Sequence, residues 1–371
     1  MLISRKLGSN EIVWFKNSNS YFVLPPMVKD LLLLIDQKKS YTEINQYLKQ
    51  CKAISIQNIK KIISDSYKLY HNQHKIIVVK KKALQCIIPK KYASIKTYSF
   101  NSTTFTLHFE TENIKSLIHP LFAHLEILKL KTSIYQYHFF TQQEQLCFLR
   151  NNELIGHWAL KNAHIFLGKI SMQIIMDYTK KAEDEWMSVL HASAISNNKN
   201  ALLLLGESGN GKSTALSLLL ANGFNALADD FVPIDTDEKI HSFPAAISVK
   251  SGAKPSLTPY FPELKILTEQ AITTSKKRVT YLPIPQQNFQ KKAYCKGLVF
   301  IKYDKNAKLE IEKISSLNAF QKIVPDAWIS PLKENVEYFL DWFLNMHCYQ
   351  LTYSNNDRMV ETVHKIFNDD I

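Results

Sequence analysis

Glycine is scarce in this sequence, with nine in 371 residues, and cysteine is scarcer still, with five. The cysteines are odd in number, widely spaced and never paired as C-x-x-C: Cys51, Cys86, Cys147, Cys295 and Cys348. Such spacing argues against a disulfide framework and against a zinc site. It predicts reduced thiols and a cytoplasmic protein.

Long apolar runs are also missing. The first ten residues lack the apolar core of a signal peptide, and no uninterrupted apolar stretch approaches the roughly 20 residues that span a bilayer. We therefore expect no membrane partner. The length, with 46% apolar and 21% charged residues, allows two or three domains with a sizeable core.

Acidic residues are fewer than basic ones, 33 against 46, which gives a formal charge of +13. The lysines are scattered along the chain rather than gathered in one block. A charge of this sign attracts nucleic acids, phosphorylated ligands and acidic peptides. A merely solvated lysine-rich surface explains it equally well.

Three of the nine glycines fall within eight positions, and these positions match the phosphate-binding pattern G-x-x-x-x-G-K-[ST]. With the residue that follows, the loop comprises Gly206, Glu207, Ser208, Gly209, Asn210, Gly211, Lys212, Ser213 and Thr214. The apolar run 201–205 predicts a buried strand before it. Residues 214–222 predict a helix with Leu216, Leu219 and Leu220 on one face, ended by Gly223.

A strand, a glycine-rich loop and a helix N-terminus together direct backbone N–H groups and a positive dipole end toward an anion. Lys212 would reach the β- and γ-phosphates, and the Ser213 hydroxyl would ligate Mg²⁺. The alternative is an accidental match in a turn, which the correct flanks on both sides disfavour. The pattern predicts a site for a nucleotide or another polyphosphate.

Two adjacent carboxylates, Asp229 and Asp230, follow the short apolar strand expected at 225–228. One carboxylate can hold the metal while the other accepts a proton from an incoming hydroxyl. Because side chains alternate along a strand, one of the pair should face the γ-phosphate. His191 is expected on the neighbouring strand before the loop, where a packed and a catalytic role both stay open.

Residues 1–75 have the pattern of a separate small domain. Strands are expected at 11–16 and 21–24, followed by a helix at 28–36 that Pro25 and Pro26 open. The Ser40-Tyr41-Thr42-Glu43 stretch is a capping box for a second helix ending near Gln50, and Ser55 can cap a third. This order indicates a winged-helix-like unit.

The chain as a whole predicts a mixed α/β, multidomain fold. Residues 1–75 form the first domain, residues 76–185 a mixed α/β connecting region that packs on the last domain, and residues 186–371 the catalytic domain. In the connecting region we expect a strand at 103–110, a hairpin turn at Asn151-Asn152, and a helix from His164 to about Leu190.

The stretch L-P-P-M-V-K-D-L-L-L-L-I-D, followed by Y-T-E-I-N-Q-Y-L, resembles the PqqD family. The resemblance implies that residues 1–75 recognise the leader of a ribosomally made precursor peptide, mostly by pairing it onto an exposed strand edge. DNA binding and a purely structural role remain open, since these 75 residues carry twelve basic and five acidic side chains.

The pattern H-A-S-A-I, then L-L-L-L-G-E-S-G-N-G-K-S-T, then L-A-D-D-F resembles the catalytic domain of the HPr kinase/phosphorylase family. The resemblance implies a phosphate loop that binds ATP, with Ser213 as a Mg²⁺ ligand. It implies Asp229 as the general base, with Asp230 supporting it or holding the metal, and the two roles can be reversed. It maps the family's histidine to His191.

A further stretch, F-P-A-A-I-S-V-K, also resembles the family and makes Lys250 a phosphate or substrate contact. Arg278 is a weaker candidate. Thr214 stands where these enzymes usually have glutamate, and no P-G-R-N-like stretch follows. The resemblance therefore does not extend to HPr as the acceptor or to the reverse, phosphorylase reaction.

The main hypothesis is an ATP- and Mg²⁺-dependent kinase that phosphorylates a serine or threonine of a precursor peptide or small protein held by residues 1–75. One alternative is a small-molecule kinase acting on free serine. Another is a nucleotide-switched regulator that binds DNA. Against it, residues 56–72 have no arginine and no recognition-helix pattern, and their basic residues are three lysines, Lys60, Lys61 and Lys68. Nucleic acid is not expected as a partner, and assembly into a homo-oligomer is left open.

Overall fold

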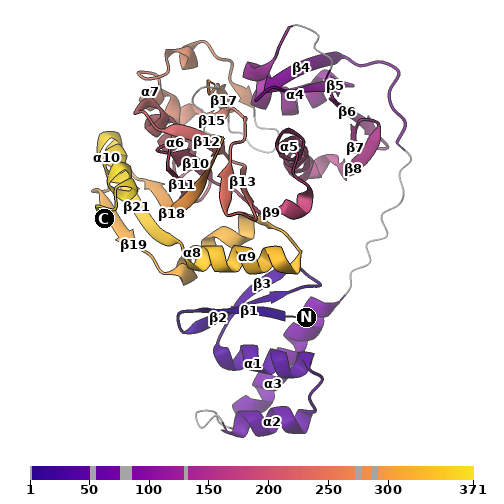
Figure 1. Ribbon diagram of the computed structural model, residues 1–371, viewed down its shortest axis with the longest axis vertical. Coiled ribbons are helices and arrows are strands. Elements are labelled where there is room, and N and C mark those ends of the chain that lie inside the picture. The colour runs from indigo at the N-terminus through magenta and orange to yellow at the C-terminus, as the bar shows by residue number, and fades with distance from the viewer. Residues whose placement is uncertain (1, 51–55, 76–85, 129–132, 272–277, 286–290) are drawn as a thin grey trace.

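The computed structural model describes residues 2–50, 56–75, 86–128, 133–271, 278–285 and 291–371 (Figure 1). These residues form a mixed α/β structure with several sheets, as the sequence predicts. Within the described part of the chain, no helix combines the length and apolar character that crossing a bilayer requires.

The N-terminal part, here called the front domain, places a three-stranded antiparallel sheet before three helices. Its elements are β1 (Leu2–Leu7), β2 (Asn10–Phe15), β3 (Ser20–Leu24), α1 (Pro26–Asp36), α2 (Tyr41–Gln50) and α3 (Ile56–His74). The capping box is confirmed, since Ser40 N donates to Glu43 Oε2 at 2.8 Å and Glu43 N to Ser40 Oγ at 3.3 Å. Ser55 lies outside the described residues.

Strand β1 was not predicted, because a charged residue interrupts the alternation of apolar side chains that marks a half-buried strand. Ile3 and Leu7 are buried, but Arg5 between them is held by Asp341 of α9 (Lys333–Leu344), with Nε 2.6 Å from Oδ1. Figure 1 shows α9 lying along this small sheet. The ring of Tyr21 also packs edge-on against Phe320 and Phe339. The front domain therefore shares its core with the C-terminal part of the chain.

A five-stranded sheet with two helices follows. It contains β4 (Ser94–Phe100), β5 (Thr103–Phe109), β6 (Tyr135–Gln142), β7 (Gln145–Arg150), β8 (Glu153–Ala159), α4 (Glu112–Phe122) and α5 (Ala163–Thr179). The predicted hairpin turn is confirmed, with φ of 47° at Asn151 and 69° at Asn152.

The prediction of a single helix up to Leu190 was wrong. The helix ends at Thr179, and residues 186–190 form a strand. A strand buried on both faces is an apolar run that periodicity cannot separate from a buried helix.

The largest sheet has the order β12-β10-β11-β18-β14-β13-β9-β20, with β21 on β18 and β19 on β21. Its strands are β9 (Trp186–Leu190), β10 (Ser193–Ser196), β11 (Asn200–Leu205), β12 (Asn225–Asp229), β13 (Val232–Asp235), β14 (Lys239–His241), β18 (Lys292–Tyr303), β19 (Glu310–Lys313), β20 (Trp328–Ile329) and β21 (His347–Tyr353). Helices α6 (Lys212–Ala221), α8 (Ser316–Ile323), α9 and α10 (Asn356–Phe367) belong to this part of the chain. A small sheet of β15 (Ile247–Lys250), β17 (Arg278–Leu282) and β16 (Gln270–Ala271) lies beside α7 (Lys254–Leu257).

Strand directions bring the functional segments to one edge of the large sheet. Strand β11 runs parallel to β18, and β18 runs parallel to β21. Strand β10 is antiparallel to both β11 and β12, so β11 and β12 point the same way. The phosphate loop after β11, Asp229 at the end of β12 and the first residue of β10 therefore meet at that edge.

Helix α6 is buried all round rather than along one apolar face. Lys212 and 215–220 are all buried, between the large sheet and contacts from β15 and α10. The expected face of three leucines is therefore part of a stretch, 215–220, that is buried on every side. Gly223 follows with φ of 90°, as expected for a residue just past a helix end.

The Asp235 carboxylate is fully buried beside the hairpin of β13 and β14. His241 Nε2 lies 2.6 Å from it, Lys181 Nζ 3.3 Å, and the backbone N–H groups of Asp237 and Lys239 donate to it at 3.0 Å. Burial alone would raise the pKa of this carboxyl, but these partners outweigh burial and lower it to about 2.

Replacing Asp235 with asparagine should therefore destabilise the fold by about 2 kcal/mol at neutral pH. Because the folded-state pKa is depressed, this stability is present above the ordinary pKa of about 4 and is lost as the pH falls toward 2. Urea unfolding at several pH values should show the difference between wild type and Asp235→Asn narrowing below about pH 4. Asp237→Asn, in the exposed turn, is the control, and equal stability of the two variants would contradict the account.

Candidate active site

The predicted phosphate loop joins β11 to α6 and closes on itself. Lys212 Nζ donates to the Gly206 carbonyl at 2.7 Å, so the two ends of the loop are held together. Tyr303 N of β18 donates to the Asn210 carbonyl at 3.0 Å, which fixes the middle of the loop to the sheet. The loop is therefore held in place by the fold around it.

Glycine is required at two of the loop positions. Gly206 has φ of 137°, and a Cβ there would lie 2.7 Å from the Ile301 carbonyl oxygen. Gly211 has φ of 97°, and its Cβ would meet Tyr303 at 3.4 Å. Both backbone conformations are unfavourable for residues with a side chain. The glycines of the phosphate-binding pattern are therefore needed for the shape of the loop as well as for the approach of a ligand.

Asp229 is the most enclosed ionisable group of the site, 2% exposed. Ser193 Oγ donates to its Oδ1 at 2.6 Å, Ser213 Oγ to the same oxygen at 3.1 Å, and Ser248 N to Oδ2 at 3.1 Å. Burial and the neighbouring charge of Asp230 raise the pKa of Asp229 to about 7, although the three hydrogen bonds act to lower it. The carboxylate thus ties β10, α6 and β15 together.

Asp230 lies just beyond the strand with φ of 62°, an uncommon conformation for a residue other than glycine. This turn leaves its side chain half exposed at the cavity, while Asp229 stays inside. His191 Nδ1 lies 3.8 Å from Asp230 Oδ1. The expectation that His191 belongs to a strand was wrong: it lies in the connection between β9 and β10, where the chain turns toward the cavity.

One lysine within the loop and one beside it bring positive charge to the site. Lys212 is buried, and its burial lowers its pKa. Lys250, at the end of β15, donates to Ser208 Oγ at 3.1 Å across the mouth of the loop. Two ammonium groups at one loop suit a polyphosphate. Arg278 does not line this cavity, and its Nε lies 3.6 Å from Glu269 instead.

A cavity of about 610 Å³ contains most of these groups, a size typical of small-molecule sites. The lining also contains residues that the sequence analysis did not single out, from segments far apart in the chain: Leu117, Leu121, Leu167, Ser248, Gly252, Ala253, Ser256, Val279, Tyr281, Tyr303, Tyr353 and Asn356. Ser193 was also missed, although the quoted H-A-S-A-I stretch contains it. Ser248 likewise lies in the F-P-A-A-I-S-V-K stretch. For the others, no local motif signalled a role, because packing between distant helices and strands brings them together.

The residues present fit a divalent cation. Ser213 and Asp229 offer hard oxygen donors side by side, the kind that Mg²⁺ takes in phosphate-loop sites along with phosphate oxygens and water. The described residues contain no group of three or more His, Cys, Asp or Glu able to hold a metal. A phosphate-loop metal does not need such a group, because the nucleotide supplies ligands.

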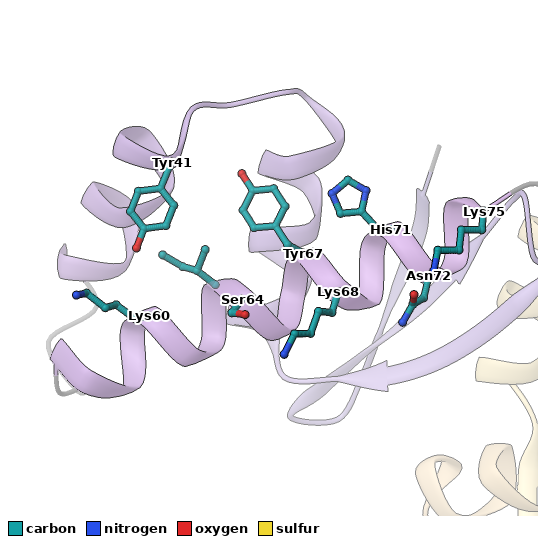
Figure 2. A pocket seen from close by; sticks show the side chains of 9 residues that line it. Tyr41, Lys60, Ser64, Tyr67, Lys68, His71, Asn72 and Lys75 are labelled. Carbon is teal, nitrogen blue, oxygen red and sulfur yellow. The ribbon is translucent and has the colours of Figure 1, made fainter.

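The front domain has a hollow of its own, far from the phosphate loop in the chain. It measures about 580 Å³ and lies along α3 beside the start of α2 (Figure 2). Its lining combines lysines with aromatic rings: Tyr41, Lys60, Ile63, Ser64, Tyr67, Lys68, His71, Asn72 and Lys75. The rings of Tyr67 and His71 stack, with centroids 6.0 Å apart. We call this hollow the α3 groove.

No protein-family model and no curated protein matches the chain. Among solved structures, it is similar to the HPr(Ser) kinase/phosphatase from Coxiella burnetii, with 12% identity and a TM-score of 0.24 over 49% of this chain and 95% of that one. A score this low carries no argument about function. The resemblance of residues 1–75 to the PqqD family gains no support from these comparisons.

Replacing Gly206 with alanine should weaken nucleotide binding by at least about tenfold, because the new Cβ forces the loop away from β18. Titration of a fluorescent ATP analogue by anisotropy measures this. Gly223→Ala is the matched control, since it imposes similar backbone strain at φ of 90° with open space around its Cβ. Equal affinity of the Gly206→Ala variant and the wild type would contradict the assignment of the loop.

Proposed function

We propose that this protein is an ATP- and Mg²⁺-dependent phosphotransferase that phosphorylates a hydroxyl group, with a serine or threonine of a precursor peptide as the acceptor. One observation carries the proposal: a closed phosphate loop and a buried Ser213–Asp229 pair lie next to a second, accessible carboxylate, Asp230. Together they provide the parts that phosphoryl transfer needs.

In the proposed reaction, the backbone N–H groups of the loop and the ammonium groups of Lys212 and Lys250 hold the phosphates of ATP. The acceptor oxygen forms a bond to the γ-phosphorus while the bond to the β–γ bridging oxygen breaks, and ADP leaves. The hydroxyl proton goes to Asp230. Positioning and charge neutralisation supply most of the catalysis.

The geometry favours one of the two assignments of the aspartates. Asp229 is enclosed and bonded to Ser213, so it suits the metal; Asp230 faces the cavity, so it suits the incoming hydroxyl. When bound, Mg²⁺ would supply positive charge against the phosphate oxygens. His191, 3.8 Å from Asp230, would orient that carboxylate.

Two features of the front domain support a docking role for a peptide. Among the described residues, β1 and β3 each pair with β2 alone, so the sheet has two edges to which a strand could add. The α3 groove adds lysines and aromatic rings that complement an acidic peptide segment (Figure 2). Holding the peptide here would raise the effective concentration of its acceptor residue at the loop.

Asp230→Asn should lower phosphoryl transfer by about a hundredfold or more, because it removes the proton acceptor and keeps the shape of the side chain. Its affinity for MgATP should change little. Asp229→Asn should instead weaken the dependence of nucleotide binding on Mg²⁺. Transfer of radiolabel from γ-labelled ATP measures the loss of catalysis, and calorimetry with and without Mg²⁺ measures the change in nucleotide binding.

The control for the Asp229→Asn and Asp230→Asn variants is Asp237→Asn, because Asp237 carries an exposed carboxylate in the turn between β13 and β14. Full transfer activity in Asp230→Asn would contradict its role as base. Loss of MgATP binding in Asp230→Asn, with binding intact in Asp229→Asn, would reverse the two assignments.

The docking role is best tested with the intact protein, because deleting residues 1–75 would uncover Phe320 and Phe339. A precursor peptide encoded beside the gene should be phosphorylated with a KM at least about tenfold lower than its C-terminal fragment alone, at similar kcat. The isolated leader should compete. Equal KM values would contradict docking, and retarded DNA mobility with a steep salt dependence would favour a DNA-binding front domain.

A further inference from the structure

A second hollow opens from the phosphate cavity on the side of the proposed base. It measures about 640 Å³ and shares His191, Ser208 and Asp230 with that cavity. A ligand in this hollow, which we call the side pocket, would therefore lie against the carboxylate and the start of the phosphate loop.

The walls of the side pocket are mainly apolar. Val189 and Leu190 of β9 and Met172 of α5 form its buried part, and the half-buried Trp328 and Phe231 also line it. A polar hydroxyl alone would leave these surfaces without a partner, so the lining suits a ligand with a large apolar group.

Helix α5 carries a glycine where it faces the side pocket. Gly168 is exposed, its φ is not positive, and a Cβ added there would meet no atom within 4 Å. Glycine inside a helix is less favourable than alanine, and nothing in the packing of this position excludes a side chain. The helix thus keeps open space at the point where a side chain would enter the pocket.

The charges around the side pocket disfavour a ligand with a free carboxylate beside the reacting hydroxyl. Among its described lining residues, one lysine and no arginine occur, and Lys169 Nζ already lies 3.0 Å from both carboxylate oxygens of Glu183. Asp230 and Asp326 add negative charge. A carboxylate next to the reacting hydroxyl, as in free serine, would meet no free lysine or arginine there.

Another hollow near the loop is a poorer candidate for the acceptor. It measures about 750 Å³ and is lined by polar groups such as Lys302, Lys322 and Gln350, and it touches Gly206 and Asn210. Neither Asp230 nor Lys212 lines it. An acceptor there would not contact the proposed base directly.

We propose that the side pocket binds the acceptor and selects a serine or threonine that stands beside a bulky apolar residue in a peptide. The inference rests on the proposed phosphotransferase function and adds the local sequence that the site prefers. The apolar neighbour would fill the space against Gly168 and Met172, and the hydroxyl would lie at Asp230.

The test uses the intact protein, γ-labelled ATP and two synthetic alanine-based peptides with one serine, preceded by phenylalanine in one and by glycine in the other. The phenylalanine peptide should have a kcat/KM at least about tenfold higher, and free L-serine should be poorer still. Gly168→Leu should fill the pocket and reduce the preference for the phenylalanine peptide to less than about threefold. Gly168→Ala should reduce it less.

Glu361→Leu is the control, because it adds the same side chain on an exposed turn of α10. Calorimetry should show unchanged MgATP binding in Gly168→Leu. Equal kcat/KM for the two peptides, preference for free serine or an unaffected Gly168→Leu variant would each overturn the side pocket as the acceptor site. Absence of MgATP binding in the wild type would instead overturn the proposed function itself.

Discussion

The site depends on one buried carboxylate, that of Asp229. Three donors from separate segments converge on it, Ser193 from β10, Ser213 from α6 and the backbone of Ser248 from β15. A buried charge without partners would be costly, so these segments are held at fixed distances from one another. Because the same pair, Ser213 and Asp229, faces the phosphate loop, the hydrogen bonds that order the fold also arrange the proposed metal ligands.

Strand direction explains why these groups meet. Strands β11, β12, β18 and β21 all run the same way, so the phosphate loop, the aspartate pair and the tyrosines Tyr303 and Tyr353 lie at one edge. Helices α4 and α5 also contribute to the phosphate cavity, which Leu117 and Leu167 line. The central five-stranded part of the chain thus takes part in forming the site.

The sequence predicted the local features of the site and missed those made by distant contacts. The loop from Gly206 to Thr214 and the pair of aspartates were predicted from local patterns, and Lys250 from a family resemblance; the structure brings these residues close together. Gly168 and Tyr281 carry no such signal, since their positions follow from packing between elements. The helix expected up to Leu190 failed because a fully buried strand and a buried helix have similar apolar content.

In the front domain, too, the sequence predicted elements that depend on neighbouring residues and missed those that depend on distant contacts. Its capping box at Ser40 and its proline-initiated helix could be read from sequence, because they depend on neighbouring residues. Strand β1 could not, because its inward residue Arg5 is charged and finds its partner, Asp341, more than 300 residues away. Its apolar contacts with α8 and α9 likewise become visible only in three dimensions.

Calorimetric titration of the intact protein with MgATP tests the central claim most directly, with Lys212→Met as the comparison. The account predicts saturable binding at one site in the wild type and a loss of at least about tenfold in affinity in Lys212→Met, because that variant keeps the side-chain bulk and removes the ammonium group. No heat of binding in the wild type, or equal affinity in the variant, would contradict it.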